Sequence, residues 1–349
     1  MSVKTANSVP ELPQRILVAS DLHLNERNRL SDHIRNLHLI EQQLAKVTYN
    51  AYVIPGDVFD KRRPTPLELK TFATHIANCK VDVIYLVEGN HDRISKNLSA
   101  LDWTILEKRI KLVEELKETF GGVRTLITHK TISESKMGPN NFQLEGTSMM
   151  ELLKDYDFVI SGHIHKPQVI KHRGLTCLVP GSIERVDFGE RLESKYFYDI
   201  ELANRKINIT RIPCILRPMF LVEYFVDEKV IKVNGEVTPL ADLKAKLDGS
   251  IIQLKLIGVK DTIRKINYQK LISTFSAVHS LDLKVSYISK DLEVYNTVKG
   301  APITTISAIN CNQIDVKELL TRLQVYCNKQ SLDNTVFKLA KKVIEEVEE

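Results

Sequence analysis

Short apolar runs alternate with helical patterns over the first 213 residues of this 349-residue chain. Runs rich in valine and isoleucine predict buried strands, which here are residues 16–20, 52–55, 81–87, 124–128, 158–161, 176–179 and 196–202. Between the first two runs, Ile34, Leu37 and Ile40 recur at helical spacing. A second helix is expected after Pro66, and a third over residues 147–156. Strands that alternate with helices predict an α/β fold.

The pattern changes after Pro213. Residues 220–226 and 251–257 alternate like strands around shorter helical stretches, which indicates a small α+β domain. Two amphipathic helices are expected near the end of the chain, over 314–328 and 332–348. The predicted regions are a first domain over 1–213, a small α+β domain over 214–291, a linker over 292–312 and a helical pair over 313–349.

Composition indicates a globular protein, with 43% hydrophobic and 27% charged residues. The net charge of +5 permits an anionic partner without demonstrating one. The five cysteines include no C-x-x-C pair, which favours a reducing compartment. Residues 1–14 lack the apolar core of a signal peptide, and no apolar run approaches the roughly 20 residues that cross a bilayer. We therefore expect a cytoplasmic protein, or one inside an infected host cell if it is viral, that is neither secreted nor inserted in a membrane.

Polar motifs follow the predicted strands of the first domain. They are Asp21-Leu22-His23, Gly56-Asp57-Val58-Phe59-Asp60, Gly89-Asn90-His91-Asp92, His129 and Gly162-His163-Ile164-His165. Aspartate, asparagine and neutral histidine are metal ligands, and an α/β sheet gathers distant residues at its strand ends. If the chain stays extended, Asp21 and His23 point to the same side, and the two oxygens of Asp57 can bridge two ions about 3.5 to 4 Å apart. The five motifs together predict a dinuclear metallohydrolase.

The ordered blocks D-x-H, G-D-x-x-D, G-N-H-D, H and G-H-x-H resemble those of the calcineurin-like metallophosphoesterases. Within that superfamily the chain most resembles the SbcD-type double-strand-break repair nucleases. This finer resemblance is carried by Pro180-Gly181-Ser182-Ile183-Glu184-Arg185, Asp187-Phe188-Gly189-Glu190 and Arg217-Pro218-Met219-Phe220. It covers about the first 220 residues by motif and the rest by architecture. It implies a β-sandwich flanked by helices, with the small α+β domain as a cap over DNA.

The resemblance implies two divalent metal ions, with manganese favoured, whereas the ligand types alone leave manganese, iron and zinc open. One ion would be held by Asp21, His23, Asp57 and His165, and the other by Asp57, Asn90, His129 and His163, with Asp57 as the bridge. His91 would be the general acid toward the leaving oxygen, and Asp92 would orient or charge it. The alternative for His91 is a structural residue beside the ligands.

Asp60 departs from the SbcD-type pattern, because several relatives carry histidine there and superfamily phosphatases often carry aspartate. It either hydrogen-bonds a ligand histidine or caps the following turn. Protein phosphatases usually continue with Arg-Gly, so the run Lys61-Arg62-Arg63 argues against that class. The candidate contacts for DNA phosphates are Lys61, Arg62, Arg63, Lys166 and Arg185, with a solvated surface run as the alternative.

The resemblance predicts a metal-dependent DNA exonuclease and endonuclease that acts on DNA ends in repair and recombination with an SbcC-type ABC ATPase. It also implies a homodimer, and it places the ATPase contact on the helical pair over 313–349, which could instead pack on this chain's own second domain. Two other functions stay open: a phosphatase or small-molecule phosphodiesterase, and a non-catalytic DNA-end-binding or ATPase-regulating subunit. The complete ligand set weighs against the last.

Overall fold

The computed structural model describes residues 12–27, 29–138, 141–275 and 279–288. Within these ranges the helices are α1 (Leu30–Lys46), α2 (Pro66–Asn78), α3 (Met149–Leu152), α4 (Leu240–Leu247), α5 (Lys260–Ile263) and α6 (Tyr268–Thr274), with 3-10 turns η1 (Asp102–Leu106) and η2 (Phe188–Glu190). The linker and the helical pair predicted over 292–312 and 313–349 lie outside the described residues.

The first sheet has six strands in the order β15-β14-β1-β2-β3-β6. The strands are β1 (Gln14–Val18), β2 (Ala51–Ile54), β3 (Ile84–Val87), β6 (Ile110–Val113), β14 (Tyr196–Ala203) and β15 (Lys206–Pro213). The four strands from β1 to β6 run parallel, with Leu17 opposite Tyr52 and Tyr52 opposite Ile84. Strand β14 pairs antiparallel with β1, and β15 with β14.

The second sheet has five strands in the order β12-β13-β11-β8-β7. The strands are β7 (Leu116–Phe120), β8 (Val123–Thr128), β11 (Phe158–Ser161), β12 (Gln168–His172) and β13 (Leu175–Val179). Its central strands β8, β11 and β13 are parallel. Two small hairpins accompany the sheets, β4 (Arg93–Ser95) with β5 (Leu98–Ser99) and β9 (Lys136–Met137) with β10 (Phe142–Gln143).

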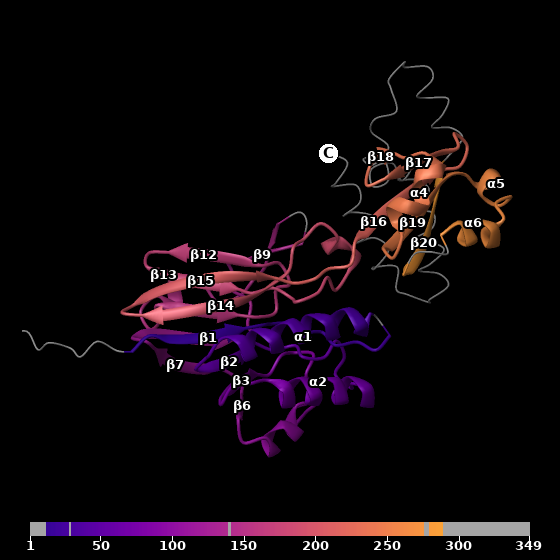
Figure 1. Ribbon diagram of the computed structural model, residues 1–349. Helices are drawn as coiled ribbons and strands as arrows, with labels where there is room; N and C mark the ends of the chain where they lie inside the picture. Colours follow the sequence, from indigo (N-terminus) through magenta and orange to yellow (C-terminus); the bar gives the residue numbers. More distant parts are fainter. Residues whose placement is uncertain (1–11, 28, 139–140, 276–278, 289–349) are drawn as a thin grey trace, which may run out of the picture. The chain divides into compact units, whose positions relative to one another are not determined.

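Alternate residues of β1 face two different cores, as the two-residue period of a strand requires. Ile16 and Val18 lie in the core between the two sheets, together with Phe158 of the second sheet. Leu17, and Ala19 just after the strand, lie in the core that the first sheet forms with α1 and α2. Figure 1 shows these two helices on the outer side of β1, β2 and β3. The result is a β-sandwich with helices on one outer face.

A third sheet follows Pro213, in the order β18-β17-β16-β19-β20. Its strands are β16 (Met219–Phe225), β17 (Val230–Val233), β18 (Glu236–Val237), β19 (Ile251–Val259) and β20 (Ser280–Ile288). Val222 and Leu254 from the sheet share a core with Leu243 and Leu247 from α4. This part of the chain therefore combines a sheet with helices.

The helix predicted over residues 147–156 is much shorter in the structure, so that prediction was wrong. The Ser148 side chain caps the start of α3 by accepting a hydrogen bond from Met150 N, but the helix ends at Leu152. The backbone N–H groups of Asp155 and Tyr156 then both donate hydrogen bonds to the Leu152 carbonyl. The chain turns at this point because β11 begins only two residues later, at Phe158.

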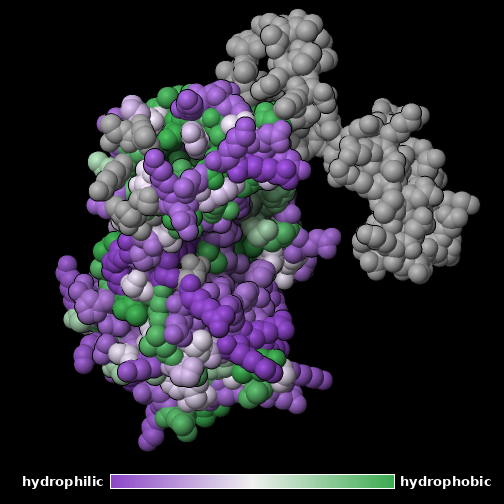
Figure 2. Space-filling view, turned by 90° about the vertical axis from the view of Figure 1, so that its right-hand side faces the viewer, coloured by the Kyte–Doolittle hydropathy of each residue, from purple (hydrophilic) through white to green (hydrophobic). Residues whose placement is uncertain are grey.

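Within the described ranges, no helix is both long and apolar enough to span a membrane. On the face drawn in Figure 2, apolar residues form small patches among polar ones.

Candidate metal centre

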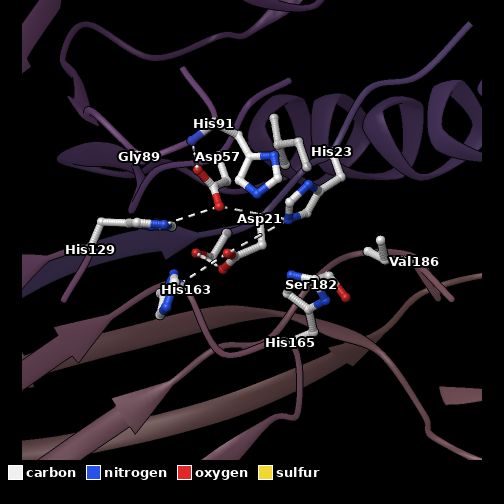
Figure 3. A network of polar contacts seen from close by, with 12 residues as sticks. Asp21, His23, Asp57, Gly89, His91, His129, His163, His165, Ser182 and Val186 are labelled. Carbon is white, nitrogen blue, oxygen red and sulfur yellow. Dashed lines mark hydrogen bonds and ion pairs between the residues drawn. The ribbon is translucent and has the colours of Figure 1, made fainter. Parts of the chain in front are cut away.

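The loops that follow β1, β2, β3, β8 and β11 carry the seven expected ligands and meet at one place. Figure 3 shows this meeting point and labels every ligand except Asn90. The first three strands belong to one sheet and the other two to the second, so the carboxyl ends of both sheets contribute. Backbone hydrogen bonds join the loops: Asp21 N donates to Gly56 O at 3.2 Å, and His23 N to Asp57 O at 3.0 Å. The fold thus unites residues that are far apart in the sequence.

The ligand atoms form two groups. Asp21, His23 and His165 make one group, and Asp57, His129 and His163 make the other, with the candidate atoms of each group within 4.8 Å of one another. Asn90 joins the second group, because its Oδ1 lies 3.0 Å from His163 Nδ1 and 3.2 Å from His129 Nε2.

Asp57 lies between the two groups. Its Oδ2 is 3.1 Å from His129 Nε2 and 3.8 Å from His23 Nε2. One carboxylate oxygen therefore faces both groups, as a bridging ligand must.

Four of the seven residues have a left-handed backbone, with φ of 50° at Asp21, 43° at His23, 49° at Asp57 and 78° at His163. The extended backbone on which a shared side for Asp21 and His23 depended is therefore absent at these two residues. A left-handed conformation costs a non-glycine residue about 1 to 2 kcal/mol, and such strain clusters at functional sites. Here the left-handed backbone turns the side chains of Asp21 and His23 toward the centre (Figure 3).

Two glycines permit the close approach of the loops. A Cβ at Gly89 would lie 2.1 Å from Asp57 Oδ1, and a Cβ at Gly162 would lie 2.1 Å from the Pro55 carbonyl and 2.6 Å from His129 Nδ1. Any larger residue at either position would displace a ligand side chain or the loop that holds it.

The residues fit divalent cations. The His23 side chain is buried, and neither of its ring nitrogens has a hydrogen-bond partner among the described residues. Its Nε2 lies 4.0 Å from Asp21 Oδ1 and 3.8 Å from Asp57 Oδ2. Atoms that share one ion at bonds of about 2.1 Å lie roughly 3 to 3.5 Å apart, so a small adjustment places these atoms around an ion. A buried unpaired nitrogen is rare unless something binds it.

Charges of opposite sign hold the second group together. Burial raises the pKa of Asp57, but the hydrogen bond from His129 and the charges of His129 and His23 outweigh burial and lower this pKa to about 2. Burial lowers the pKa of His129, but its bond to Asp57 and the charge of Asp21 raise this pKa to about 9. Burial and the neighbouring His129 lower the pKa of His163.

His91 lies beside the centre, but Asp92 does not orient its ring, so that expectation was wrong. His91 Nδ1 is 2.6 Å from the backbone carbonyl of Asp60. Asp92 is buried, and its carboxylate accepts hydrogen bonds from the backbone N–H groups of Gly89, Val58 and Phe59. Asp92 therefore joins two ligand loops, and the Asp60 carbonyl sets the His91 ring.

The Asp60 side chain faces His23. Its Oδ1 lies 3.6 Å from His23 Nδ1, and its Oδ2 accepts a hydrogen bond from Asn25 Nδ2 at 2.7 Å. The contact with His23 is the largest cause that lowers the pKa of Asp60. Asp60 thus faces a ligand histidine at ion-pair distance and not at hydrogen-bond distance, so its role stays a prediction.

The candidate DNA contacts separate into two sets. Lys61, Arg62 and Arg63 are exposed, and Arg62 lines a cavity that borders the ligands. Lys166 donates to the Gly138 carbonyl and Asn141 Oδ1. Arg185 donates to the carbonyls of residues 193 and 217. The structure therefore gives Lys166 and Arg185 internal partners, and their contact with DNA stays a prediction.

Glu190 was not among the residues expected in the site, although the motif Asp187–Glu190 contains it. Its Oε1 is 2.9 Å from His165 Nδ1. Burial raises the pKa of Glu190, but the bond from His165 and the charge of Lys195 outweigh burial and lower this pKa to about 2. Spacing alone could not reveal this contact, because it joins residues 25 positions apart.

The chain belongs to the calcineurin-like phosphoesterase superfamily, whose domain model matches residues 15–201. This match confirms the expected superfamily and its α/β fold. It covers all the strands whose loops carry the candidate ligands.

The individual proteins that match this chain have low sequence identity to it. The chain is 22% identical over 224 residues to the DNA double-strand break repair protein Mre11 of Archaeoglobus fulgidus. The match covers 49% of this chain and 50% of the length of that curated relative. Among solved structures it is similar to an archaeal phosphodiesterase, at 15% identity and a TM-score of 0.38 over 57% of this chain and 100% of the other. It is also similar to Vps29 of Entamoeba histolytica complexed with zinc, at 14% identity and a TM-score of 0.35 over 58% and 100%.

Proposed function

We propose that this chain is a two-metal-dependent nuclease that hydrolyses phosphodiester bonds at DNA ends in double-strand-break repair and recombination, with manganese as its ion. The observation that carries the proposal is the pair of ligand groups around Asp57. Part of the second group borders a cavity of about 430 Å³. The ligands Asn90 and His129 line this cavity together with Arg62 and Lys96. Two candidate ligands and two basic side chains thus face the same space, as an anionic polymer requires.

The chemistry divides between ions and side chains. Divalent ions held by such ligands lower the pKa of water and polarise a phosphate oxygen. Because the Nδ1–H of His91 contacts the Asp60 carbonyl at 2.6 Å, Nε2 is the nitrogen that faces the reaction, and it can give a proton to the leaving oxygen only when the ring carries a proton on both nitrogens. The His91 backbone N–H also donates to Asp57 Oδ1 at 2.9 Å, which fixes the residue beside the bridge.

Charge in the cavity supports a polymeric substrate. Glu88 is paired with Arg93, whose Nε donates a hydrogen bond to Glu88 Oε2 at 2.8 Å. Arg62 and Lys96 form no ion pair within the described part of the chain. Two unpaired cations beside the ligands suit the phosphates that flank a scissile bond. The similarity to Mre11 supports DNA as the polymer.

The decisive test is a nuclease assay with manganese on linear, hairpin and single-stranded DNA, run beside p-nitrophenyl phosphate. We expect DNA cleavage by the parental chain, none after addition of a chelator, and none by Asp57→Asn. Hydrolysis of p-nitrophenyl phosphate alone would replace the proposal with a phosphatase. DNA binding without hydrolysis of either substrate would identify a non-catalytic subunit. Magnesium and zinc in parallel reactions test the choice of ion.

We also propose that the segment 313–349 binds an SbcC-type ABC ATPase and that the full chain forms a homodimer. The two apolar stripes expected in this segment support the first part, because a pair of amphipathic helices needs a partner surface. A chain that ends at Asn312 should lose ATPase binding in a pull-down and keep metal-dependent cleavage. An intact complex with that truncation would reject the docking role, and sedimentation of the full chain tests the dimer.

A further inference from the structure

The Glu190 carboxylate joins a candidate metal ligand to a buried lysine. Its Oε1 lies 2.9 Å from His165 Nδ1, and its Oε2 lies 2.8 Å from Lys195 Nζ. The backbone N–H of Val186 also donates to Oε2, at 3.0 Å. Each carboxylate oxygen therefore has its own donors, one toward the site and two away from it.

Lys195 is buried, with 1% of its surface exposed. Besides Glu190, its Nζ contacts Glu193 Oε2 at 2.9 Å and the His165 carbonyl at 2.8 Å. These three acceptors match the three N–H bonds of an ammonium group. A buried charge is retained only when it is well paired, so the network holds its members in one arrangement. It holds His165 at two points, the ring and the backbone carbonyl.

The ring contact determines which nitrogen of His165 is available. When Nδ1 donates its proton to Glu190, the lone pair is on Nε2. His165 shares a ligand group with Asp21 and His23. A carboxylate that fixes the orientation of a ligand histidine in this way commonly governs metal affinity.

We propose that Glu190, itself held by Lys195, is a positioning residue that fixes the ring and the Nδ1–H tautomer of His165 and so sets the ion affinity of the Asp21, His23 and His165 group. This inference rests on the proposed function in one respect, namely that His165 binds an ion. It adds a role for the Asp187–Glu190 motif, which the seven ligands and His91 leave unexplained.

Glu190→Gln tests the role because a glutamine has only one oxygen. Lys195 Nζ and Val186 N both point at Oε2, so the amide oxygen will take that position. The amide NH₂ then faces His165 Nδ1, which must accept a hydrogen bond and shift its proton to Nε2. Glu190→Asp is a second variant, since it keeps the charge near Lys195 but withdraws the carboxylate from the ring by one methylene.

Glu193→Gln is the matched control. Glu193 contacts the same Lys195 ammonium at 2.9 Å, whereas the described partner of the His165 ring nitrogens is Glu190. A loss that comes only from a weakened lysine network would therefore appear in this variant too. Circular dichroism and thermal melting of the metal-free proteins show which variants are folded.

The experiment uses the full chain and two measurements. Manganese binding is followed by electron paramagnetic resonance of the free ion, and the His165 tautomer by ¹⁵N NMR of the metal-free protein, assigned with His165→Gln. We expect both Glu190→Gln and Glu190→Asp to lower the affinity for one of the two manganese ions by about 10- to 100-fold. We expect Glu190→Gln also to move the proton of the His165 ring to Nε2. We expect Glu193→Gln to leave affinity within about threefold and the tautomer unchanged.

Three results would overturn the inference: parental affinity in both Glu190 variants, an equal loss in Glu193→Gln, or a parental protein that binds no manganese. A parental protein that binds manganese but cuts no DNA would instead reject the nuclease and leave the role of Glu190 standing.

Discussion

The histidines around the centre differ in the group that holds their Nδ1 atom. His129 Nδ1 is 2.7 Å from the Pro55 carbonyl, and His91 Nδ1 is 2.6 Å from the Asp60 carbonyl. His165 instead faces the Glu190 carboxylate. In each case the contact leaves Nε2 as the functional nitrogen, for a proton at His91 and for an ion at the other two.

His91→Ala should keep metal binding and lose turnover. His91 is outside the two groups that the seven expected ligands form, although it makes a further group with His23 and Asp60. A general acid contributes about 10²- to 10⁴-fold in rate. We expect a fall of that size in DNA cleavage with unchanged manganese stoichiometry, measured on the same preparation. Cleavage at the parental rate would remove His91 from the mechanism.

His33 should make stability depend on pH. It is buried in α1, its Nδ1 is 2.9 Å from the Leu22 carbonyl, and burial, with the charge of Arg29, lowers its pKa from 6.5 to about 4. Between these values the unfolded chain binds a proton that the folded chain does not. The contribution of neutral His33 to the free energy of unfolding is therefore complete above pH 6.5. It is lost as the pH falls toward 4, by at most about 3 kcal/mol.

His33→Asn keeps an N–H donor for the Leu22 carbonyl and does not titrate. Urea unfolding of the metal-free proteins from pH 7 to 4 should show a flatter pH dependence for this variant. Parallel curves for the two proteins would show that His33 is not the group responsible.

At the scale of elements, α2 begins with a capping box. Thr65 accepts a hydrogen bond from Glu68 N, the Glu68 carboxylate accepts one from Thr65 N, and Pro66 occupies the first turn. Thr65→Ala should lower the free energy of unfolding by about 1 kcal/mol in chemical denaturation. Thr65→Ser keeps the hydroxyl and should stay close to the parental value. Equal losses in both variants would point to packing of the threonine methyl.

The sequence predicted the buried strands better than the edge strands. The expected run 158–161 coincides with β11, and the runs at 52–55 and 176–179 match β2 and β13 to within one residue at either end. By contrast β7 and β15 were not expected. Both lie at the edge of a sheet and carry several exposed polar residues, so neither forms a continuous apolar run.

The candidate site, too, could be predicted only where apolar runs mark the residues. Side chains at strand ends could be found from the sequence, because each ligand motif follows an apolar run. The partner of His91 could not, since it is a backbone carbonyl and every residue has one. Asp92 was misassigned because proximity in sequence to His91 does not reveal that its carboxylate faces the backbone of Val58 and Phe59.

At the scale of the whole molecule, a net charge of +5 gives only weak attraction for DNA, so local cations should dominate the salt dependence. Arg62 and Lys96 line the cavity beside the ligands. Arg62→Gln and Lys96→Gln should each reduce the slope of log Kd against log salt by about 1 for duplex DNA. Fluorescence anisotropy over a salt series measures this slope.

Arg124→Gln is the control for that series. Arg124 is at the start of β8, whereas the ligand His129 follows the end of that strand, and its guanidinium is paired with Asp157. Its removal should leave the slope unchanged. Equal effects of all three substitutions would mean that DNA senses only the total charge.

The left-handed backbone at Asp21, His23, Asp57 and His163 also bears on how much folded protein a cell holds. At about 1 to 2 kcal/mol for each residue, the strain is a sizeable share of a net stability of about 5 to 15 kcal/mol. An ion that binds only the folded chain offsets it by mass action. Scarcity of that ion would then increase the unfolded fraction exposed to proteases, so metal supply would control abundance as well as activity.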